Sequence, residues 1–275
     1  MGLSQSTNNA KCVEKMELVE ASGKGSCSAA KGSTKEVEVD DVQRLLLMVL
    51  KMADNHLEMD LSHCNSAIHF YMSAKCIREL LMGFHCLDVS TLQVWSTYIH
   101  RLCIDNSTSE VYGIMDPAMC IYNDDVPKSL VDVRKYVQEK LMSQNKVCYL
   151  LPLVHAEHWQ LFVLCPRENT VVFFCSLNWD VDKNTKKIIS TAFEVHQISN
   201  GNRKKAITWL KPDSRKQHNN TDCGYYVMKN MLDIVSANIT ESWMQVFNDP
   251  TELTQEDLYD LRLRWAKCFF ELYKG

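Results

Sequence analysis

Cys223 occupies the position in this chain that most favours nucleophilic chemistry. It follows a polar turn, residues 219–222, and opens a segment, residues 223–238, whose apolar residues recur at helical spacing. The unpaired N–H groups at a helix N-terminus stabilise a thiolate, so a cysteine there has a lowered pKa. Gly224 lets a backbone or a substrate approach closely. The pattern predicts a reactive thiol, with a buried structural cysteine as the alternative in a chain with 12 cysteines.

A nucleophilic cysteine needs a base, which is normally a histidine that folding brings close. His158 is the best placed of the nine histidines, because it opens an apolar segment and has Trp159 beside it to shield the imidazole from water. His155 and His218 are its rivals. For each of them, a surface histidine with no catalytic role is the alternative.

Attack on a carbonyl also needs a hydrogen-bond donor for the oxyanion that forms. Gln217 lies six residues before Cys223 in the same polar loop. Its side-chain amide could therefore face the same reaction centre as the backbone N–H of Cys223. A solvated loop glutamine is the alternative.

Two different periods in the sequence predict the elements that position these residues. Helical spacing predicts a largely buried helix from Asp41 through residues 42–59, and further helices at 129–142, 180–197, 223–238 and 254–272. Ser129 with Asp132, and Thr254 with Asp257, predict capping boxes. Strands are predicted at 147–154, 158–165, 170–176 and 206–211, with a hairpin turn at 166–169 and a long polar loop at 212–222. This order predicts an α+β fold, a small mixed sheet flanked by helices.

Composition and charge exclude several classes of protein. The 275 residues carry 30 Lys and Arg against 34 Asp and Glu, a balance that indicates neither a polyanion-binding nor a membrane-binding surface. The longest apolar run, Leu45–Leu50, is too short to span a bilayer, and the first residues lack a secretory segment. The absence of C-x-x-C pairs disfavours structural zinc, and disulfides are not expected without secretion. We expect an intracellular protein, in the nucleus or cytoplasm, whose cysteines are mostly buried thiols.

The N-terminal residues 1–39 are rich in Ser, Lys, Thr, Asn and Glu and predict a disordered tail, with one folded domain at 40–275. Gly2 with Ser6 matches the N-myristoylation pattern, which is short enough to occur by chance; a plain disordered start is the alternative. Nucleic-acid binding is supported only by a basic run, residues 203–205 with Lys211, Arg215 and Lys216, which a solvated loop explains more simply.

His158-Trp159, followed by Gln217 and by Asp222-Cys223-Gly224 ahead of an apolar helix, resembles the ubiquitin-like-protein-specific (SUMO-type) family of papain-like cysteine proteases, and within it divergent plant transposon-related members. The resemblance covers roughly residues 60–240 and is strongest at 147–240. It implies a papain-like fold with Cys223 as nucleophile, His158 as base and Gln217 as oxyanion-hole amide, and with Trp159 and Gly224 at the substrate channel. It implies no metal or cofactor, and a monomer whose partner is a ubiquitin-like modifier or its conjugates.

Two positions depart from the pattern of that family. The family orients its histidine with an aspartate in an Asp-Ser-Leu block, where this chain has Cys175-Ser176-Leu177. If the hairpin turns near Pro166, antiparallel pairing places position 175 roughly opposite His158. Asn178 or Asp180 could orient the imidazole instead, as an asparagine does in papain-type triads. The family also has a Trp-Leu pair lining the channel for a diglycine tail, where this chain has Cys86-Leu87.

The resemblance and its departures leave two hypotheses for function. The first is a cysteine peptidase that hydrolyses peptide or isopeptide bonds after the C-terminal diglycine of a ubiquitin-like modifier, weakened by loss of the acid. The second is a catalytically inactive pseudo-protease that binds the modifier without cutting it. A thiolate stabilised by a helix and an imidazolium depends on the acid less than a serine does, which narrowly favours the enzyme.

Overall fold

The computed structural model describes residues 39–52, 56–59, 70–83, 85–201 and 205–273. Apart from Val39, the predicted tail and the candidate myristoylation site at Gly2 lie outside these residues. Asp40–Gly275 forms one compact unit. Within the described ranges, no helix combines the length and the apolar composition needed to cross a membrane.

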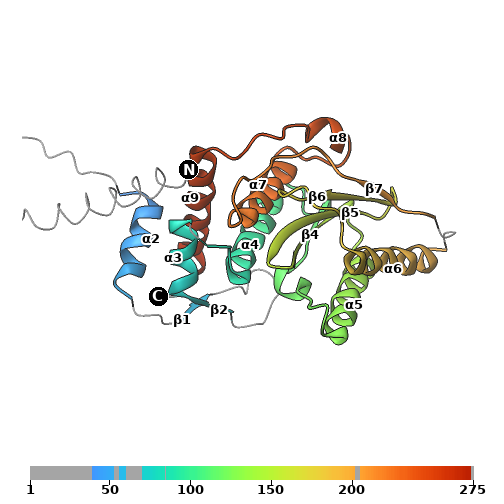
Figure 1. The fold of residues 1–275 in the computed structure, drawn as a ribbon, viewed down its shortest axis with the longest axis horizontal. Coiled ribbons are helices and arrows are strands. Elements are labelled where there is room, and N and C mark those ends of the chain that lie inside the picture. Colours follow the sequence, from blue (N-terminus) through green and yellow to red (C-terminus); the bar gives the residue numbers. More distant parts are fainter. Residues whose placement is uncertain (1–38, 53–55, 60–69, 84, 202–204, 274–275) are drawn as a thin grey trace, which may run out of the picture. The chain divides into compact units, whose positions relative to one another are not determined.

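A five-stranded mixed sheet forms the centre of the fold (Figure 1). Its three central strands are antiparallel and each edge strand is parallel to its neighbour. In spatial order the strands are β3 (Tyr112–Ile114), β4 (Cys148–His155), β5 (His158–Cys165), β6 (Thr170–Phe174) and β7 (Thr208–Leu210). A separate antiparallel pair consists of β1 (His56–Met59) and β2 (Phe70–Ser73).

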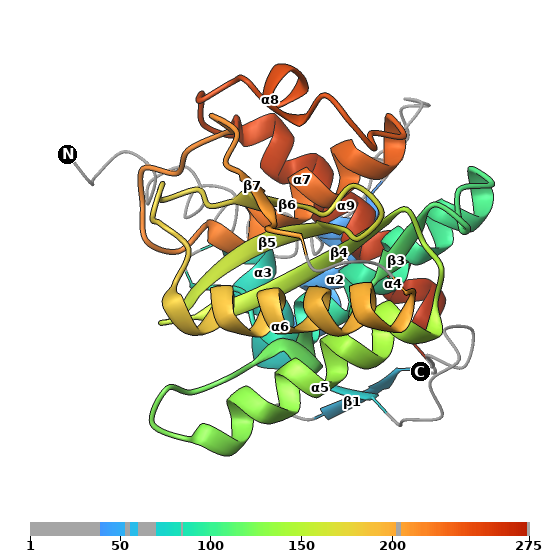
Figure 2. The same cartoon turned by 90° about the vertical axis from the view of Figure 1, so that its right-hand side faces the viewer.

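Helices cover both faces of the sheet. Figure 2 shows α5 and α6 in front of the strands, while α4, α7 and α9 lie behind them. The helical segments are α2 (Asp41–Leu50), α3 (Ala74–Met82), α4 (Val89–Asp105), the 3₁₀ turn η2 (Pro117–Cys120), α5 (Pro127–Ser143), α6 (Lys183–Ser199), α7 (Cys223–Ser236), α8 (Trp243–Val246) and α9 (Gln255–Leu272).

Two hydrophobic clusters, one on each face, hold these layers together. Because side chains alternate along a strand, β5 contributes to both. Leu161 and Val163 pack into the cluster formed with α4, α7 and α9. Phe162 and Leu164 pack into the cluster formed with α5 and α6. The predicted α+β architecture is confirmed, and β5 is the central strand that carries His158 at its first position.

Several predicted elements are confirmed with small shifts at their ends. The strands at 148–155, 158–165 and 170–174 and the helices α6, α7 and α9 lie where the sequence predicts them. Thr254 and Asp257 form the predicted capping box of α9. The nine cysteines in the described part of the chain are free thiols.

The predicted helix through residues 42–59 is wrong beyond Leu50. The chain turns at Lys51, and His56–Met59 forms the strand β1. In this strand Leu57 and Met59 are buried while His56 and Glu58 are exposed, so the local period is two rather than 3.6. Pairing with β2 therefore decides the conformation of this segment.

The predicted capping box at Ser129 is also wrong. Helix α5 begins at Pro127 with Val126 as its N-cap, and no side chain caps it. Proline suits the first helical position because the N–H that it lacks would have no partner there. The Ser129 hydroxyl instead donates to the carbonyl of Val126 and accepts from the N–H of Asn123.

The register between β5 and β6 differs from the predicted one by two residues. Cys165 pairs with Thr170 and Leu161 with Phe174, so the same register places position 175 opposite Gln160 rather than His158. The connection spans residues 166–169 as predicted, but it is centred between Arg167 and Glu168 rather than near Pro166. Because the side-chain period of a strand is two, a two-residue shift keeps Cys175 on the same face as His158.

Candidate active site

Cys223 is the first residue of α7, as the sequence predicts. The turn before it is shaped by Asn219, whose side-chain oxygen accepts hydrogen bonds from the N–H groups of Thr221 and Asp222, both at 3.0 Å. The helix then starts with the Tyr225 N–H donating to the Asp222 carbonyl at 2.9 Å. The backbone N–H of Trp159, on β5, lies 3.4 Å from the Cys223 Sγ. The nucleophile candidate therefore sits against the strand that carries His158.

The expected lowering of the Cys223 pKa by the helix N-terminus does not match the structure. Cys223 is fully buried, and burial raises the pKa of its thiol to about 12. The Trp159 N–H opposes this increase, whereas the neighbouring Cys86 thiol adds to it. Desolvation disfavours the charged form of a group, and here it outweighs the helix. The resting sulfur is a thiol at neutral pH.

His158 is buried at the start of β5. Its Nε2 lies 3.3 Å from the Sγ of Cys175, and its ring contacts the Trp179 ring at a centroid distance of 4.7 Å. Burial lowers the pKa of the imidazole to about 4. A neutral imidazole can act as a general base toward a protonated nucleophile, because it can accept the proton of the Cys223 thiol as that sulfur attacks.

No hydrogen bond joins the His158 imidazole to the Cys223 thiol within the described residues. The two residues are connected instead through the Trp159 backbone N–H. Catalytic hydrogen bonds are often long in the absence of substrate and tighten when it binds. That folding brings His158 within reach of the Cys223 sulfur therefore stays a prediction.

Among the described residues, neither of the two alternative orienting residues, Asn178 and Asp180, has a side chain hydrogen-bonded to the imidazole. The Lys211 ammonium lies 3.3 Å from a carboxylate oxygen of Asp180 and donates to the Asn178 carbonyl at 3.0 Å. The Asp180 side chain is fully exposed. Among the described residues, Cys175 is the side chain hydrogen-bonded to the His158 ring, so a thiol stands where a triad acid would orient the base.

Gln217 is buried and held from both sides of its amide. Its side-chain oxygen accepts from the Ser176 hydroxyl at 2.5 Å, and its side-chain nitrogen donates to the Asn219 carbonyl at 2.6 Å. Its backbone N–H donates to the Ser176 carbonyl at 3.0 Å. An amide nitrogen carries two N–H groups, so one donor is left for a developing oxyanion.

The segment containing Cys86 and Leu87 forms the other side of this region. The Leu87 carbonyl accepts a hydrogen bond from the Trp159 indole N–H at 2.8 Å. A Cβ on Gly224 would lie 2.9 Å from three atoms of the Leu87 side chain, closer than such contacts allow. Gly224 is therefore required for the approach of Leu87 to the first turn of α7.

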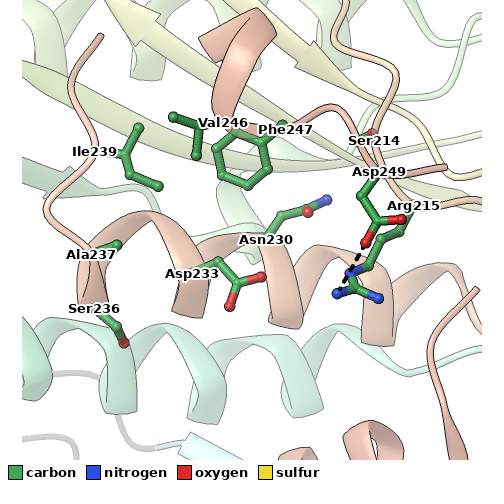
Figure 3. A pocket seen from close by; sticks show the side chains of 10 residues that line it. All are labelled: Ser214, Arg215, Asn230, Asp233, Ser236, Ala237, Ile239, Val246, Phe247 and Asp249. Atoms are coloured by element: carbon green, nitrogen blue, oxygen red, sulfur yellow. Dashed lines mark ion pairs between the residues drawn. The ribbon is translucent and has the colours of Figure 1, made fainter. Parts of the chain in front are cut away.

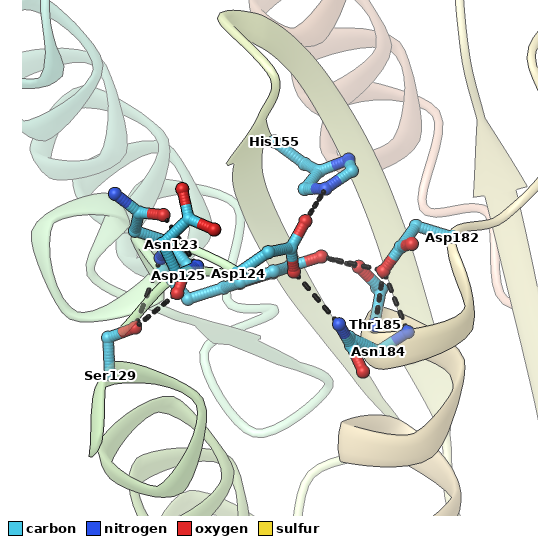
Figure 4. A network of polar contacts seen from close by, with 9 residues as sticks. Asn123, Asp124, Asp125, Ser129, His155, Asp182, Asn184 and Thr185 are labelled. Atoms are coloured by element: carbon cyan, nitrogen blue, oxygen red, sulfur yellow. Dashed lines mark hydrogen bonds and ion pairs between the residues drawn. The ribbon is translucent and has the colours of Figure 1, made fainter. Parts of the chain in front are cut away.

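The rival histidines lie in other environments. His155 Nε2 is 3.0 Å from a carboxylate oxygen of Asp124, as Figure 4 shows, and its ring stacks on Tyr122. Asp182 caps α6 by accepting from the N–H groups of Asn184 and Thr185. Asp124, His155 and Asp182 could together offer three ligand atoms to a metal ion, since these atoms lie within 4.8 Å of one another. Protein partners satisfy all three, and the network joins the end of β4 to α6.

His218 is largely exposed and pairs with Glu252 at 3.0 Å.

A surface cavity lies apart from the candidate active site. Figure 3 shows it along the later turns of α7, lined by Asn230 and Asp233 and by residues of the segments 214–215 and 246–249. Cys223, His158 and Gln217 do not line it.

Trp179 is the residue of this region that the sequence did not reveal. The sequence predicts that Trp159 shields the imidazole, but the Trp159 indole donates to the Leu87 carbonyl and the Trp179 ring contacts His158 instead. The Trp179 N–H also lies 3.3 Å from the Cys175 Sγ. Trp179 lies between β6 and α6, where no strand or helix periodicity in the sequence could indicate which way its side chain points.

Comparison with known proteins gives a consistent result. The family model of the Ulp1 protease family, C-terminal catalytic domain, matches residues 119–275. The C-terminal Ulp1 protease domain in complex with Smt3, the yeast ortholog of SUMO, is 15% identical with a TM-score of 0.59, over 90% of this chain and 98% of that chain. The Ulp1-like SUMO protease catalytic domain of Chaetomium thermophilum is 14% identical with a TM-score of 0.58, over 83% and 87%. No curated protein matches the chain.

Proposed function

Because this chain belongs to the Ulp1 protease family of cysteine peptidases, we propose that it hydrolyses peptide or isopeptide bonds after the C-terminal diglycine of a SUMO-type ubiquitin-like modifier. The observation that carries this proposal is the 3.4 Å contact between the Trp159 N–H and the Cys223 Sγ. It joins the start of α7 to the start of β5, so the nucleophile and base candidates come from adjoining elements.

In the proposed reaction, the Cys223 sulfur attacks the carbonyl carbon after the second glycine. His158 accepts the thiol proton as the carbon–sulfur bond forms and then gives it to the leaving amine. The side-chain amide of Gln217 and the backbone N–H of Cys223 donate to the oxyanion. Water, deprotonated by His158, then hydrolyses the thioester and releases the modifier with a free carboxylate.

The proposed channel for the diglycine lies between the Cys86-Leu87 segment and the start of β5. Its support is the contact of Leu87 with both the Trp159 indole and Gly224, which leaves little room for side chains. Glycine is the residue that passes through such a constriction. The solved Ulp1 domain bound to Smt3 supports a ubiquitin-like modifier as the partner.

A binding-only role is the second candidate, and Cys175 is the observation that favours it. No carboxylate bonds to the His158 ring among the described residues, and the resting thiol is protonated at neutral pH. A domain with these properties could hold the modifier without cleaving it. The two candidates share a partner and differ in whether a covalent bond to Cys223 forms.

Capture by an electrophilic modifier distinguishes the two candidates. The protein is incubated with SUMO carrying a C-terminal vinyl or propargyl group, and with ubiquitin carrying the same group for comparison. An enzyme gives a covalent adduct that Cys223→Ala abolishes and Cys148→Ala retains, because Cys148 is buried in β4. Tight binding to SUMO without an adduct would reject the peptidase and support the binding role.

A further inference from the structure

Cys86 brings a second thiol to Cys223. Cys86 is exposed, and its Sγ donates to the Asn220 carbonyl at 3.4 Å, three residues before the nucleophile candidate. Its side chain also interacts directly with the Cys223 thiol. One sulfur of the pair is thus open to solvent while the other is buried at the start of α7.

The surroundings hold the two thiols together. Leu87, next to Cys86, is fixed by the hydrogen bond from the Trp159 indole to its carbonyl. Its side chain rests on Gly224, directly after Cys223. The residues that follow the two cysteines, Leu87 and Gly224, are therefore packed against each other.

Other thiols in the described residues lack this combination of contact and exposure. Cys148 and Cys165 lie opposite each other on β4 and β5 with their sulfurs 3.4 Å apart, yet both are buried in the core. Cys175 is buried beside the His158 ring. An oxidant dissolved in water reaches Cys86 directly and these three only after the core opens.

We propose that Cys86 and Cys223 form a reversible disulfide when the protein meets a hydroperoxide, and that this bond switches the active site off. The proposal rests on the proposed function in one respect, since it is the nucleophile of the peptidase that the bond would block. The exposed Cys86 receives the oxidant and then forms the disulfide with the buried nucleophile, which the oxidant does not reach directly.

The chemistry proceeds in two balanced steps. The Cys86 thiol attacks the hydroperoxide and the O–O bond breaks. Cys86 becomes a sulfenic acid, with release of water from hydrogen peroxide or of the corresponding alcohol from an organic hydroperoxide. The Cys223 sulfur then attacks the Cys86 sulfur, the S–O bond breaks, and the thiol proton leaves with the hydroxide as a water molecule. A dithiol reductant reverses the result by attacking the exposed Cys86 sulfur and freeing Cys223 as a thiol.

The test treats the full-length protein with hydrogen peroxide and follows two readouts. Peptide mapping without reductant detects a Cys86–Cys223 cross-link. Cleavage of a SUMO C-terminal substrate is measured before oxidation, after oxidation, and after dithiothreitol, with each variant normalised to its own reduced activity. The variants are Cys86→Ser, which removes the exposed thiol, and Cys148→Ala, which removes one thiol of the buried pair.

Wild type and Cys148→Ala should form the cross-link, lose activity and recover most of it with dithiothreitol. Cys86→Ser should keep at least about ten-fold more activity than wild type through the same treatment, because the buried Cys223 is oxidised only through Cys86. Oxidised wild type with Cys223 as sulfinic or sulfonic acid, and no cross-link, would overturn the proposal. The cross-link in a protein that has no activity even when reduced would support the thiol pair and reject the peptidase.

Discussion

The Nε2 of His158 lies 3.3 Å from the Sγ of Cys175. Other hydrogen-bond donors surround this sulfur, and a stronger acceptor than a thiol could bind them. The Trp179 backbone N–H lies 3.3 Å from the same sulfur and the Gln160 side-chain amide lies 4.0 Å from it. Cys175 is only 3% exposed. Sulfur accepts hydrogen bonds weakly, so these donors are poorly satisfied.

Replacing this thiol by a carboxylate, in Cys175→Asp, should activate the enzyme. The Trp179 N–H and the imidazole can both donate to the carboxylate, and its charge stabilises the imidazolium that forms during attack. We expect the rate of SUMO C-terminal cleavage to rise about ten-fold, a small part of the roughly 10⁴-fold loss seen when a triad carboxylate becomes an amide. Steady-state cleavage and the melting temperature are measured on the same sample.

Cys175→Asn is the matched control, because it offers the same shape and an acceptor oxygen without the charge. It should gain less than Cys175→Asp. If Cys175→Asp folds with an unchanged melting temperature and shows no faster cleavage than wild type, the thiol at this position does not limit the reaction.

The low pKa of His158 predicts an unusual pH profile. The imidazole acts as a base only when neutral, and burial lowers its pKa to about 4. The acid limb of kcat/KM, which reports the free enzyme, should therefore lie near that value rather than near the ordinary histidine pKa of about 6.5. Cys175→Asp should move this limb to higher pH, since a nearby carboxylate favours the imidazolium. An acid limb near 6.5 in wild type would contradict the buried, neutral imidazole.

The same shift predicts how stability depends on pH. The pKa of His158 is lower in the folded protein than in the unfolded chain. At a pH between these two pKa values, the unfolded chain therefore binds more protons than the folded protein. Stability is then full above about pH 6.5 and falls as the pH approaches 4, by about 3 kcal/mol from this residue. Urea unfolding of wild type and of His158→Gln across this range measures the contribution. The variant should have the shallower slope, although His100 and His196, whose pKa values are also lowered by burial, remain in both.

The central elements were predictable because their periods are strong and local. β5 alternates between two clusters, and α7 and α9 carry apolar faces that match the buried side chains seen in the structure. Thr254 and Asp257 cap α9 as expected because a capping box needs only residues close in sequence. The positions of Cys223 and His158 at the starts of their elements followed from the same patterns.

The parts that sequence reasoning missed depend on distant contacts. The short strands β1, β2 and β3 each gain their conformation from a partner strand rather than from a long period of their own. The Cys223 pKa depends on burial by the rest of the domain, which outweighs the local effect of the helix. Trp179 meets His158 only because the chain turns after β6, at Asn178 with a φ of 59°.

The hydrogen bond from Ser176 to Gln217 predicts that Ser176 is a positioning residue. The Ser176 hydroxyl holds the amide oxygen of Gln217 and so fixes the direction in which the amide nitrogen donates to the oxyanion. Gln217→Ala should reduce kcat about 10²-fold through loss of an oxyanion donor. Ser176→Ala should reduce kcat by a smaller factor, about five- to ten-fold, with little change in KM.

A double-mutant cycle separates positioning from a general structural effect. If Ser176 acts through the amide, Ser176→Ala should change kcat little once Gln217 is alanine, because the two effects are coupled. Independent effects that multiply in the double variant would show that Ser176 contributes by another route. Gln217→Glu, which keeps the shape but removes the donor nitrogen, should resemble Gln217→Ala.

The turn between β4 and β5, directly before His158, predicts a stabilising substitution. Ala156 and Glu157 have φ values of 49° and 60°, a region that costs non-glycine residues about 1–2 kcal/mol each. A two-residue hairpin turn with both φ values positive favours Asn followed by Gly. Glu157→Gly should therefore raise the free energy of unfolding by about 1 kcal/mol, after the greater flexibility of glycine in the unfolded chain is counted. Ala156→Asn should add a smaller gain.

The matched control is Glu168→Gly in the next turn. The φ of Glu168 is not positive, so the same substitution should destabilise the protein there. Denaturant unfolding measures all three variants, and equal destabilisation by Glu157→Gly and Glu168→Gly would show that the turn before His158 is not strained.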